Sequence, residues 1–88
     1  MDWKVSFNKS AGKQFGKLDR EIQAFILAYF HERVVAEPDP RRLGTALTGK
    51  FKGYWRYRIG NYRAICELRD HELIVLVLKI GHRKEVYD

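Results

Sequence analysis

The segment YWRYRIGNYRAIC, residues 54–66, alternates polar and apolar side chains on both sides of a Gly60-Asn61 pair. Such alternation is typical of β-strands, and a two-residue loop of this composition is typical of a tight hairpin turn. Pairing across this turn places Arg58 directly opposite Arg63. Like charges in that position destabilise a sheet, so we expect the chain to use the pair to bind an anion. Guanidinium groups suit phosphate, because their forked donors meet two oxygens at once.

The alternation also predicts which side chains share a face of the hairpin. One face collects the residues predicted to meet the core, namely Trp55, Tyr57, Ile59, Tyr62, Ala64, Cys66 and Leu68. The opposite face collects Tyr54, Arg56, Arg58, Arg63, Ile65 and Glu67. The first face is predicted to be buried, and the second is predicted to be basic and open to solvent.

The bulk composition indicates one basic globular domain spanning residues 1–88. The chain is 45% apolar and 32% charged, which excludes a disordered class, and its formal net charge is +6. Residues 40–66 contain seven Lys or Arg and no Asp or Glu. This balance predicts a polyanionic partner, with nucleic acid favoured over a membrane surface.

Cys66 is the only cysteine, so the sequence excludes a disulfide framework and a zinc ligand set, and we expect a buried structural thiol. No metal or other cofactor is predicted.

The N-terminus lacks the apolar run of a signal peptide, and the longest apolar run, Leu73–Leu78, is too short to cross a bilayer. We therefore expect a cytoplasmic protein without a membrane segment.

The remaining segments predict a two-layer α+β fold in the order β-α-α-β-β-β. A short strand at residues 3–7 precedes a helix that begins at Asn8 or Ser10 and reaches Leu18. Asp19 begins a longer helix, whose apolar stripe is Ile22, Phe25, Ile26, Tyr29, Phe30 and Val34. The apolar run from residue 73 to 78 predicts a central strand. A helical hairpin is thus expected on one face of a largely antiparallel four-stranded sheet.

A basic sheet face of this kind can bind a nucleic-acid backbone, dock an acidic protein or stabilise a phosphorane during RNA cleavage. Cleavage also needs a group that moves protons, which arginine does poorly. His82 titrates near neutrality, and Tyr87 could transfer a proton with the help of neighbouring cations or stack on a base. Both have structural alternatives, His82 as an exposed residue after a strand and Tyr87 as an anchor for the C-terminus.

The register of the last strand decides which tail residue reaches the basic face. A two-residue turn at Asp70-His71 would place Leu78 opposite Arg63 and send His82 to that face. A three-residue turn or a β-bulge would send Arg83 there instead. Residue pattern alone leaves both registers open.

The run at residues 54–63, followed by a hydrophobic strand and by IGHRKEVY at residues 80–87, resembles RelE-type toxins of bacterial toxin–antitoxin systems. The segments at 39–43 and 47–49 also resemble that family, and the resemblance covers essentially the whole chain. It implies a ribosome-dependent endoribonuclease that cuts mRNA in the A site of the small ribosomal subunit. Ribosomal RNA is then a partner of the toxin at that site. It also implies a cognate antitoxin that wraps and masks the toxin.

The resemblance further implies site roles. Arg63 and Arg83 match the family's arginines at the scissile phosphate, Tyr87 matches its C-terminal tyrosine, and His82 falls where relatives carry lysine or histidine. The expected RNA contacts are Arg56, Arg58, Lys50, Lys52, Tyr54 and Lys84. Well-studied members carry two lysines on the first hairpin strand, where this chain has Tyr54 and Arg56, so the proton acceptor differs from theirs or electrostatics carries most of the rate.

Two other functions fit the same residues. One is a non-nucleolytic toxin resembling the ParE branch, which poisons DNA gyrase and would use the basic face and tail to bind protein. The other is a simple RNA-binding module, which would bind with steep salt dependence and leave RNA uncut. The Arg58/Arg63 pair together with Tyr87 favours the nuclease.

Overall fold

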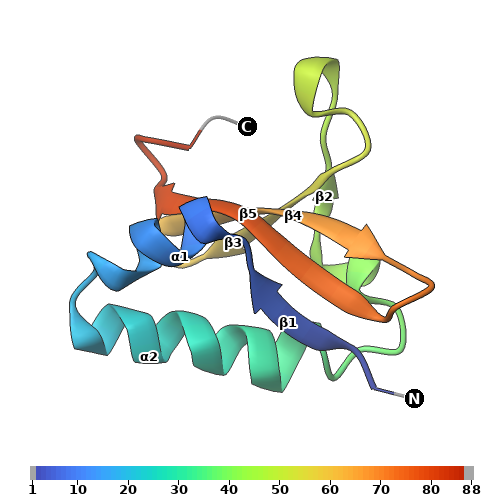
Figure 1. Cartoon of the computed structure of the whole chain (residues 1–88), viewed down its shortest axis with the longest axis horizontal. Coiled ribbons are helices and arrows are strands. Elements are labelled where there is room, and N and C mark those ends of the chain that lie inside the picture. The colour runs from blue at the N-terminus through green and yellow to red at the C-terminus, as the bar shows by residue number, and fades with distance from the viewer. Residues whose placement is uncertain (1, 87–88) are drawn as a thin grey trace.

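Two helices pack on one face of a five-stranded sheet in the computed structural model of this chain, which describes residues 2–86 (Figure 1). The strands are β1 (Lys4–Phe7), β2 (Thr45–Ala46), β3 (Trp55–Ile59), β4 (Tyr62–Arg69) and β5 (Ile74–His82). They lie in the order β1-β5-β4-β3-β2, and β1 pairs parallel with β5 while the other neighbours are antiparallel. The predicted α+β class is confirmed. The predicted strand number misses β2, because a two-residue strand is too short to show alternation.

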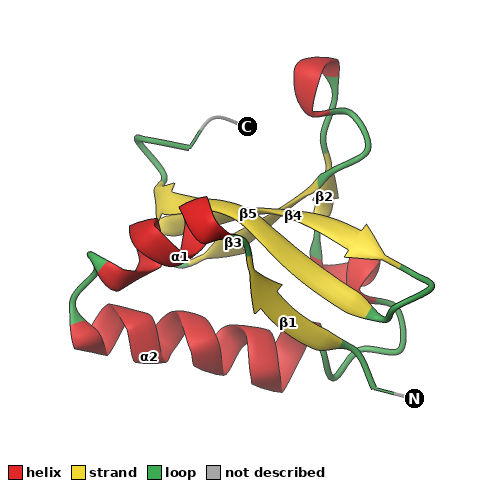
Figure 2. Cartoon of the chain, in the orientation of Figure 1, coloured by secondary structure: helices red, strands yellow, loops and turns green. Residues whose placement is uncertain are grey.

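The helical layer contains α1 (Lys9–Gly16) and α2 (Arg20–Tyr29), and a π-helical turn, η1 (Phe30–Val34), extends α2 (Figure 2). Asn8 begins α1, since its Oδ1 accepts a hydrogen bond from the Ala11 N–H at 2.8 Å. Asp19 occupies the cap position of α2 without a side-chain bond to the helix. The predicted apolar stripe faces the sheet through Ile26, Phe30 and Val34, all fully buried.

The main core lies between the helices and the sheet, as the alternation predicted. Tyr57, Ile59, Ala64 and Cys66 of the hairpin are fully buried there. The Phe30 and Tyr57 rings meet nearly edge to face, with centroids 6.1 Å apart. Burial raises the pKa of the Cys66 thiol, which therefore stays protonated and unreactive, as expected of a structural cysteine.

A second, smaller apolar cluster lies on the opposite face of the sheet, and we call it the outer cluster. Its buried members are Leu47, Ile65 and Val86, and Phe51 and Tyr54 pack against them. Ile65 was predicted to point into solvent, but its side chain is 1% exposed. The expectation of an open face is therefore corrected: the segment before β3, including the 3-10 turn η3 (Gly49–Phe51), and the C-terminal tail cover part of it.

The β4–β5 connection has four residues, Asp70–Leu73, rather than two, and Leu73 has a positive φ of 55°. Ile65 pairs with Lys79 while Cys66 pairs with Val77, so Leu78 is an extra residue in a β-bulge. The bulge places Gly81 opposite Arg63 and His82 opposite Tyr62. His82 therefore lies on the side of the sheet that Tyr62 occupies, and the register that would have placed Leu78 opposite Arg63 and sent His82 to the basic face is excluded.

The hairpin turn generates a first testable prediction. Gly60 has φ +59°, and a Cβ at this position would lie 3.1 Å from Phe25 Cε2. Gly60→Ala is therefore expected to lower the free energy of unfolding by about 1–2 kcal/mol, measured by urea denaturation. Gly12→Ala is the matched control, because a Cβ at Gly12 would meet nothing within 4 Å and helical alanine gains about 0.5–1 kcal/mol over glycine. Equal urea midpoints for Gly60→Ala and the wild type would show that the turn tolerates a side chain.

Candidate nucleic-acid interface

The β3–β4 hairpin gathers three arginines on the face of the sheet that the helices leave uncovered, and we call it the arginine face. Arg58 pairs directly with Arg63, and Arg56 pairs with Ile65 of the outer cluster. Cross-strand partners share a face, so the three guanidinium groups belong to one surface. Arg58 is exposed, Arg56 is half-buried and Arg63 is 9% exposed. The predicted juxtaposition of these arginines is confirmed.

Arg63 is anchored at the hairpin turn. Its Nη1 donates hydrogen bonds to the Gly60 carbonyl at 2.9 Å and to the Tyr62 carbonyl at 2.8 Å. These bonds use part of the guanidinium's donor set and restrict its position. A cation held in place loses little conformational entropy when it meets an anion, which is the arrangement that favours electrostatic stabilisation of a developing charge. The Gly81 opposite Arg63 presents no side chain that would crowd it.

The lysines expected to contact RNA lie on the loop between β2 and β3. Lys50 and Lys52 are exposed on and beside η3, and this loop projects from the sheet in Figure 1. Tyr54, expected to contact RNA as well, is half-buried against the outer cluster. Phe51 packs on the same cluster and so holds the base of the lysine loop against the arginine face.

The C-terminal tail leaves the sheet after His82 and stays close to the hairpin. The Arg83 N–H donates to the Asn61 carbonyl at 2.8 Å, which ties the start of the tail to the hairpin turn. Arg83 and Lys84 are exposed. Tyr87, the predicted proton-transfer or stacking residue, lies outside the described residues. The structure thus brings the start of the tail beside the Gly60-Asn61 turn that also anchors Arg63.

His82 has specific partners at the end of β5. Its ring contacts the Tyr62 ring edge to face, with centroids 5.6 Å apart. Its Nδ1 accepts a hydrogen bond from the Lys84 N–H at 3.2 Å. A neutral imidazole that accepts at Nδ1 carries its proton on Nε2. In this tautomer Nε2 can donate a hydrogen bond, but it cannot accept a proton.

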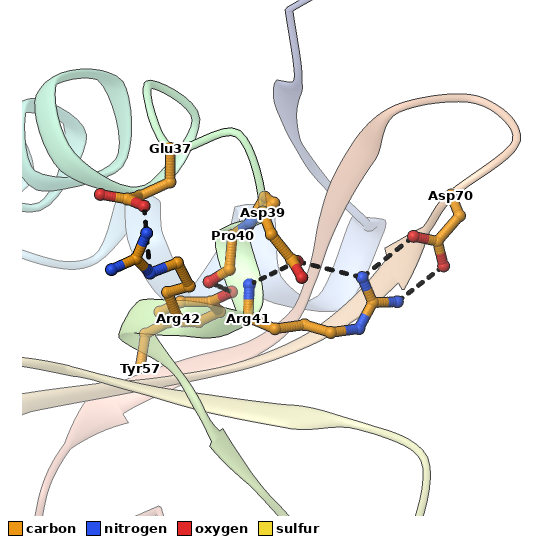
Figure 3. A network of polar contacts seen from close by, with 7 residues as sticks. All are labelled: Glu37, Asp39, Pro40, Arg41, Arg42, Tyr57 and Asp70. Atoms are coloured by element: carbon orange, nitrogen blue, oxygen red, sulfur yellow. Dashed lines mark hydrogen bonds and ion pairs between the residues drawn. The ribbon is translucent and has the colours of Figure 1, made fainter.

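Arg41 and Arg42, which are also among the seven cations in residues 40–66, contact carboxylates and do not belong to the arginine face. Arg41 forms a bidentate pair with Asp70, at 3.0 Å to Oδ1 and 2.6 Å to Oδ2, and contacts Asp39 Oδ1 at 3.3 Å. Arg42 Nε lies 3.8 Å from Glu37 Oε1. Figure 3 shows this network, which links the 3-10 turn η2 (Pro40–Leu43) to the β4–β5 connection. The cationic stretch in the sequence therefore divides between a structural network and a candidate binding surface.

The network also has electrostatic consequences. The hydrogen bond from Arg41 holds the pKa of the Asp70 carboxyl below its usual value, and the same bond raises the pKa of Arg41. Beneath it, the buried Tyr57 hydroxyl donates to the Pro40 carbonyl at 2.8 Å, and burial raises the pKa of Tyr57. Arg41 further lies 5.8 Å from the centroid of the Trp55 ring. These contacts hold the 39–43 segment against the hairpin.

Gly81 and Val86 are the residues near the arginine face that sequence reasoning missed. A Cβ on Gly81 would lie 3.2 Å from Val86 Cγ2, so the tail rests directly on the backbone of β5. Val86 is 2% exposed in the outer cluster. The sequence signal was a lone valine in an otherwise polar tail, which does not reveal its partners.

Residues 2–86 show neither a metal-binding cluster nor a membrane-spanning helix. No group of three or more His, Cys, Asp or Glu side chains is arranged to hold a metal ion within that range. No helix in the same range has the length and apolar character needed to cross a bilayer.

Comparison with known proteins gives consistent similarities. Residues 5–87 match the family model for the ParE toxin of the type II toxin–antitoxin system parDE. The chain is 28% identical over 87 residues to Toxin RelG of Mycobacterium tuberculosis, with 99% of this chain and 98% of that protein covered. In structure it is similar to a chain of the RelBE2 toxin–antitoxin complex of M. tuberculosis, with TM-score 0.85, 26% identity and coverage of 94% and 100%. A chain of the E. coli RelBE complex shares the fold, with TM-score 0.72, 20% identity and coverage of 91% and 95%.

The Arg41–Asp70 pair generates a second prediction. Because the folded pKa of Asp70 is lowered, its contribution to stability is present above the unfolded pKa of about 3.9 and is lost as the pH falls through the folded value. Asp70→Asn is expected to lower the free energy of unfolding at pH 7 by at most about 1 kcal/mol, since both partners are partly exposed. The difference from the wild type should vanish in acid, as measured by urea denaturation from pH 7 to pH 2.

Glu72→Gln is the control for this prediction. Glu72 follows in the same connection, and its carboxylate makes a longer contact of 3.7 Å with Arg69. Its effect on stability should be smaller than that of Asp70→Asn. A pH-independent difference between Asp70→Asn and the wild type would contradict the assigned role of the Asp70 charge.

Proposed function

This chain belongs to the ParE toxin family of type II toxin–antitoxin systems and is a RelE-type toxin, and we propose that it is a ribosome-dependent endoribonuclease that cleaves mRNA in the ribosomal A site. The observation that carries the proposal is the Arg58/Arg63 pair, held on one face of the sheet beside Arg56. Such a pair costs stability within the sheet, and a bound phosphodiester would offset its repulsion.

The proposed reaction uses the nucleophile that RNA itself provides. The ribose 2′-oxygen attacks the adjacent phosphorus, loses its proton to a base and forms a 2′,3′-cyclic phosphate, while the 5′-oxygen leaves and takes up a proton. Negative charge increases on the phosphorane oxygens in the transition state. Arg63 and Arg83 are assigned to stabilise this charge, and the bonds from Arg63 to the Gly60 and Tyr62 carbonyls support a preorganised role.

The two tail residues with titratable rings receive different roles in this proposal. His82 accepts the Lys84 N–H at Nδ1, so its neutral ring is suited to donate a hydrogen bond from Nε2 and unsuited to act as the base. Tyr87 is assigned proton transfer or base stacking from the sequence alone. Its unperturbed pKa of about 10 requires neighbouring cations to favour the phenolate.

The remaining basic residues are assigned to RNA binding. Arg56 and Arg58 would hold the backbone of mRNA, and Lys50, Lys52 and Lys84 would extend the contact toward mRNA and ribosomal RNA. Tyr54 would contribute from the base of the lysine loop. The exposure of Arg58 and of the three lysines supports this assignment.

A cognate antitoxin is the proposed protein partner, and the cytoplasm, where ribosomes are found, is the proposed location. Similar chains have been solved in toxin–antitoxin complexes named RelBE2, from M. tuberculosis, and RelBE, from E. coli. An arginine face of this kind would suit an acidic or amphipathic antitoxin segment that masks it.

A second candidate function follows from the matching family model, whose description names ParE. In that case the arginine face and tail would bind protein, as in the gyrase-directed toxins of the ParE branch. The anchored Arg63, directly opposite Arg58 in the hairpin, supports the nuclease, because two adjacent guanidinium groups suit a phosphodiester.

One experiment separates these functions. The toxin is added to a cell-free translation reaction, and mRNA 5′ ends are mapped by primer extension. Cuts at codon-spaced positions that require ribosomes are expected. Intact mRNA accompanied by cleaved, gyrase-bound DNA would instead establish the ParE-like function, and RNA that is bound in a salt-dependent manner but uncut would indicate a simple RNA-binding module.

The phosphorane assignment generates a third prediction. Arg63→Ala and Arg83→Ala are each expected to lower the rate of ribosome-dependent cleavage by about 10²–10³-fold, because each removes a cation from the developing charge. Growth inhibition should be lost in both, while circular dichroism stays that of the wild type. Arg42→Ala is the matched control, since Arg42 contacts Glu37 away from the arginine face. Undiminished toxicity in both folded variants would rule out the assignment.

The division of roles in the tail generates a fourth prediction. Tyr87→Phe is expected to lower the cleavage rate by about 10²–10⁴-fold, the usual contribution of general acid–base catalysis. His82→Asn, whose Oδ1 can still accept the Lys84 N–H, should retain far more activity than His82→Leu, measured by single-turnover cleavage on ribosomes. Equal losses in the asparagine and leucine variants would argue that the imidazole itself moves the proton.

A further inference from the structure

The C-terminal tail reverses direction immediately after β5. The N–H groups of Glu85 and Val86 both donate to the His82 carbonyl, at 2.7 and 3.2 Å. The side chains reinforce this turn, because Glu85 Oε1 accepts from the His82 N–H at 3.3 Å and His82 Nδ1 accepts from the Lys84 N–H at 3.2 Å. The chain is thereby folded back toward the sheet rather than extended into solvent.

The reversal seats Val86 on the arginine face. Val86 packs with Ile65 and Leu47 in the outer cluster, and Ile65 is the cross-strand partner of Arg56. The tail therefore rests among the side chains assigned to RNA. Val86 is 2% exposed, and its apolar contact holds a segment that otherwise consists of exposed polar residues, Arg83, Lys84 and Glu85.

Gly81 permits this seating because it has no side chain. A Cβ at this position would lie 3.2 Å from Val86 Cγ2 and 3.5 Å from Glu85 Oε1. The backbone of Gly81 is not in the left-handed region, so close approach rather than conformation calls for glycine here. Gly81 is also the cross-strand partner of Arg63. The contact between Val86 and Gly81 thus lies next to the arginine assigned to the phosphorane.

A cavity adjoins the tail on the side of the helices. This cavity has a volume of about 450 Å³, and its lining includes Gln14 of α1, Lys17 and Leu18 just after α1, and Glu85 and Val86 of the tail. None of the arginines assigned to RNA lines this cavity. The position of the tail therefore depends on the outer cluster and on the turn at His82 rather than on the helices.

We propose that the contact of Val86 with Gly81 and Ile65, which we call the clasp, sets the position of the C-terminal tail. Gly81 and Val86 are then positioning residues for cleavage. This role rests on the proposed nuclease function. Arg83 belongs to the reversed segment that leads to Val86, and a seated Val86 limits how far Arg83 can move from Arg63. Loss of the clasp leaves the main core intact, since Val86 belongs to the outer cluster alone.

The experiment compares Val86→Ala and Gly81→Ala with the wild type by two independent readouts. The first is the rate at which trypsin releases the C-terminal peptide after Arg83 or Lys84, followed by mass spectrometry at early times. An unseated tail should be cut at least about fivefold faster. The second is ribosome-dependent cleavage, in which kcat should fall about tenfold or more while KM changes less than about twofold, since misplacement affects the reacting geometry more than binding.

Two further variants separate positioning from general loss of packing. Val5→Ala removes the same methyl groups from β1, which packs on the main core, and should change neither the trypsin rate at the tail nor kcat. Val86→Ile should keep both values at those of the wild type, because the adjoining cavity can accept the added methyl group.

The outcomes distinguish the clasp from the proposed function. A wild-type trypsin rate in Val86→Ala would overturn the clasp, and faster trypsin cleavage with an unchanged kcat would overturn its role in positioning. If the wild-type toxin cuts no RNA, the nuclease function and the positioning role both fall, while the trypsin comparison still decides whether Val86 seats the tail.

Discussion

The β3–β4 hairpin register is the constraint on which the rest of the molecule depends. Gly60 turns the chain with a positive φ, and the pairing that follows sets Arg58 against Arg63 on one face. The same register sends Tyr57 and Cys66 into the main core on the other face. Because successive side chains alternate, a shift by one residue would bury the arginines and expose the core. The burial of the core therefore maintains an arrangement of like charges that the sheet alone would disfavour.

The two faces of the sheet are covered in different ways. On one face, α1, α2 and η1 supply an apolar layer, in which Ile26, Phe30 and Val34 are fully buried. On the other, the outer cluster covers only part of the surface, with Leu47 from the loop before β3 and Val86 from the tail meeting over Ile65. This small cluster holds a loop and the C-terminal tail beside the arginines. A toxin that acts on RNA within a ribosome would need such segments positioned but accessible.

The β-bulge at Leu78 connects the sheet to the tail. If the pairing of Cys66 with Val77 continued without it, Ile80 would lie opposite Arg63 and its side chain would point at the arginine face. The extra residue replaces Ile80 with Gly81 at that position and turns Ile80 to the core, where it is 3% exposed. The glycine opposite Arg63 and the seat for Val86 are thus both products of one added residue in β5.

Alternation and turn chemistry alone determined the hairpin, the Arg58/Arg63 pair, the buried Cys66 and the α+β layering, since these depend on residues near one another in the chain. Only the tertiary structure decided the burial of Ile65, the diversion of Arg41 and Arg42 to carboxylates, the side of the sheet that His82 occupies and the contact of Val86 with Gly81. Each of these depends on how separate segments of the chain meet in space. A four-residue connection or a bulge changes such pairings without altering the local residue pattern, and so local pattern carries no information about them.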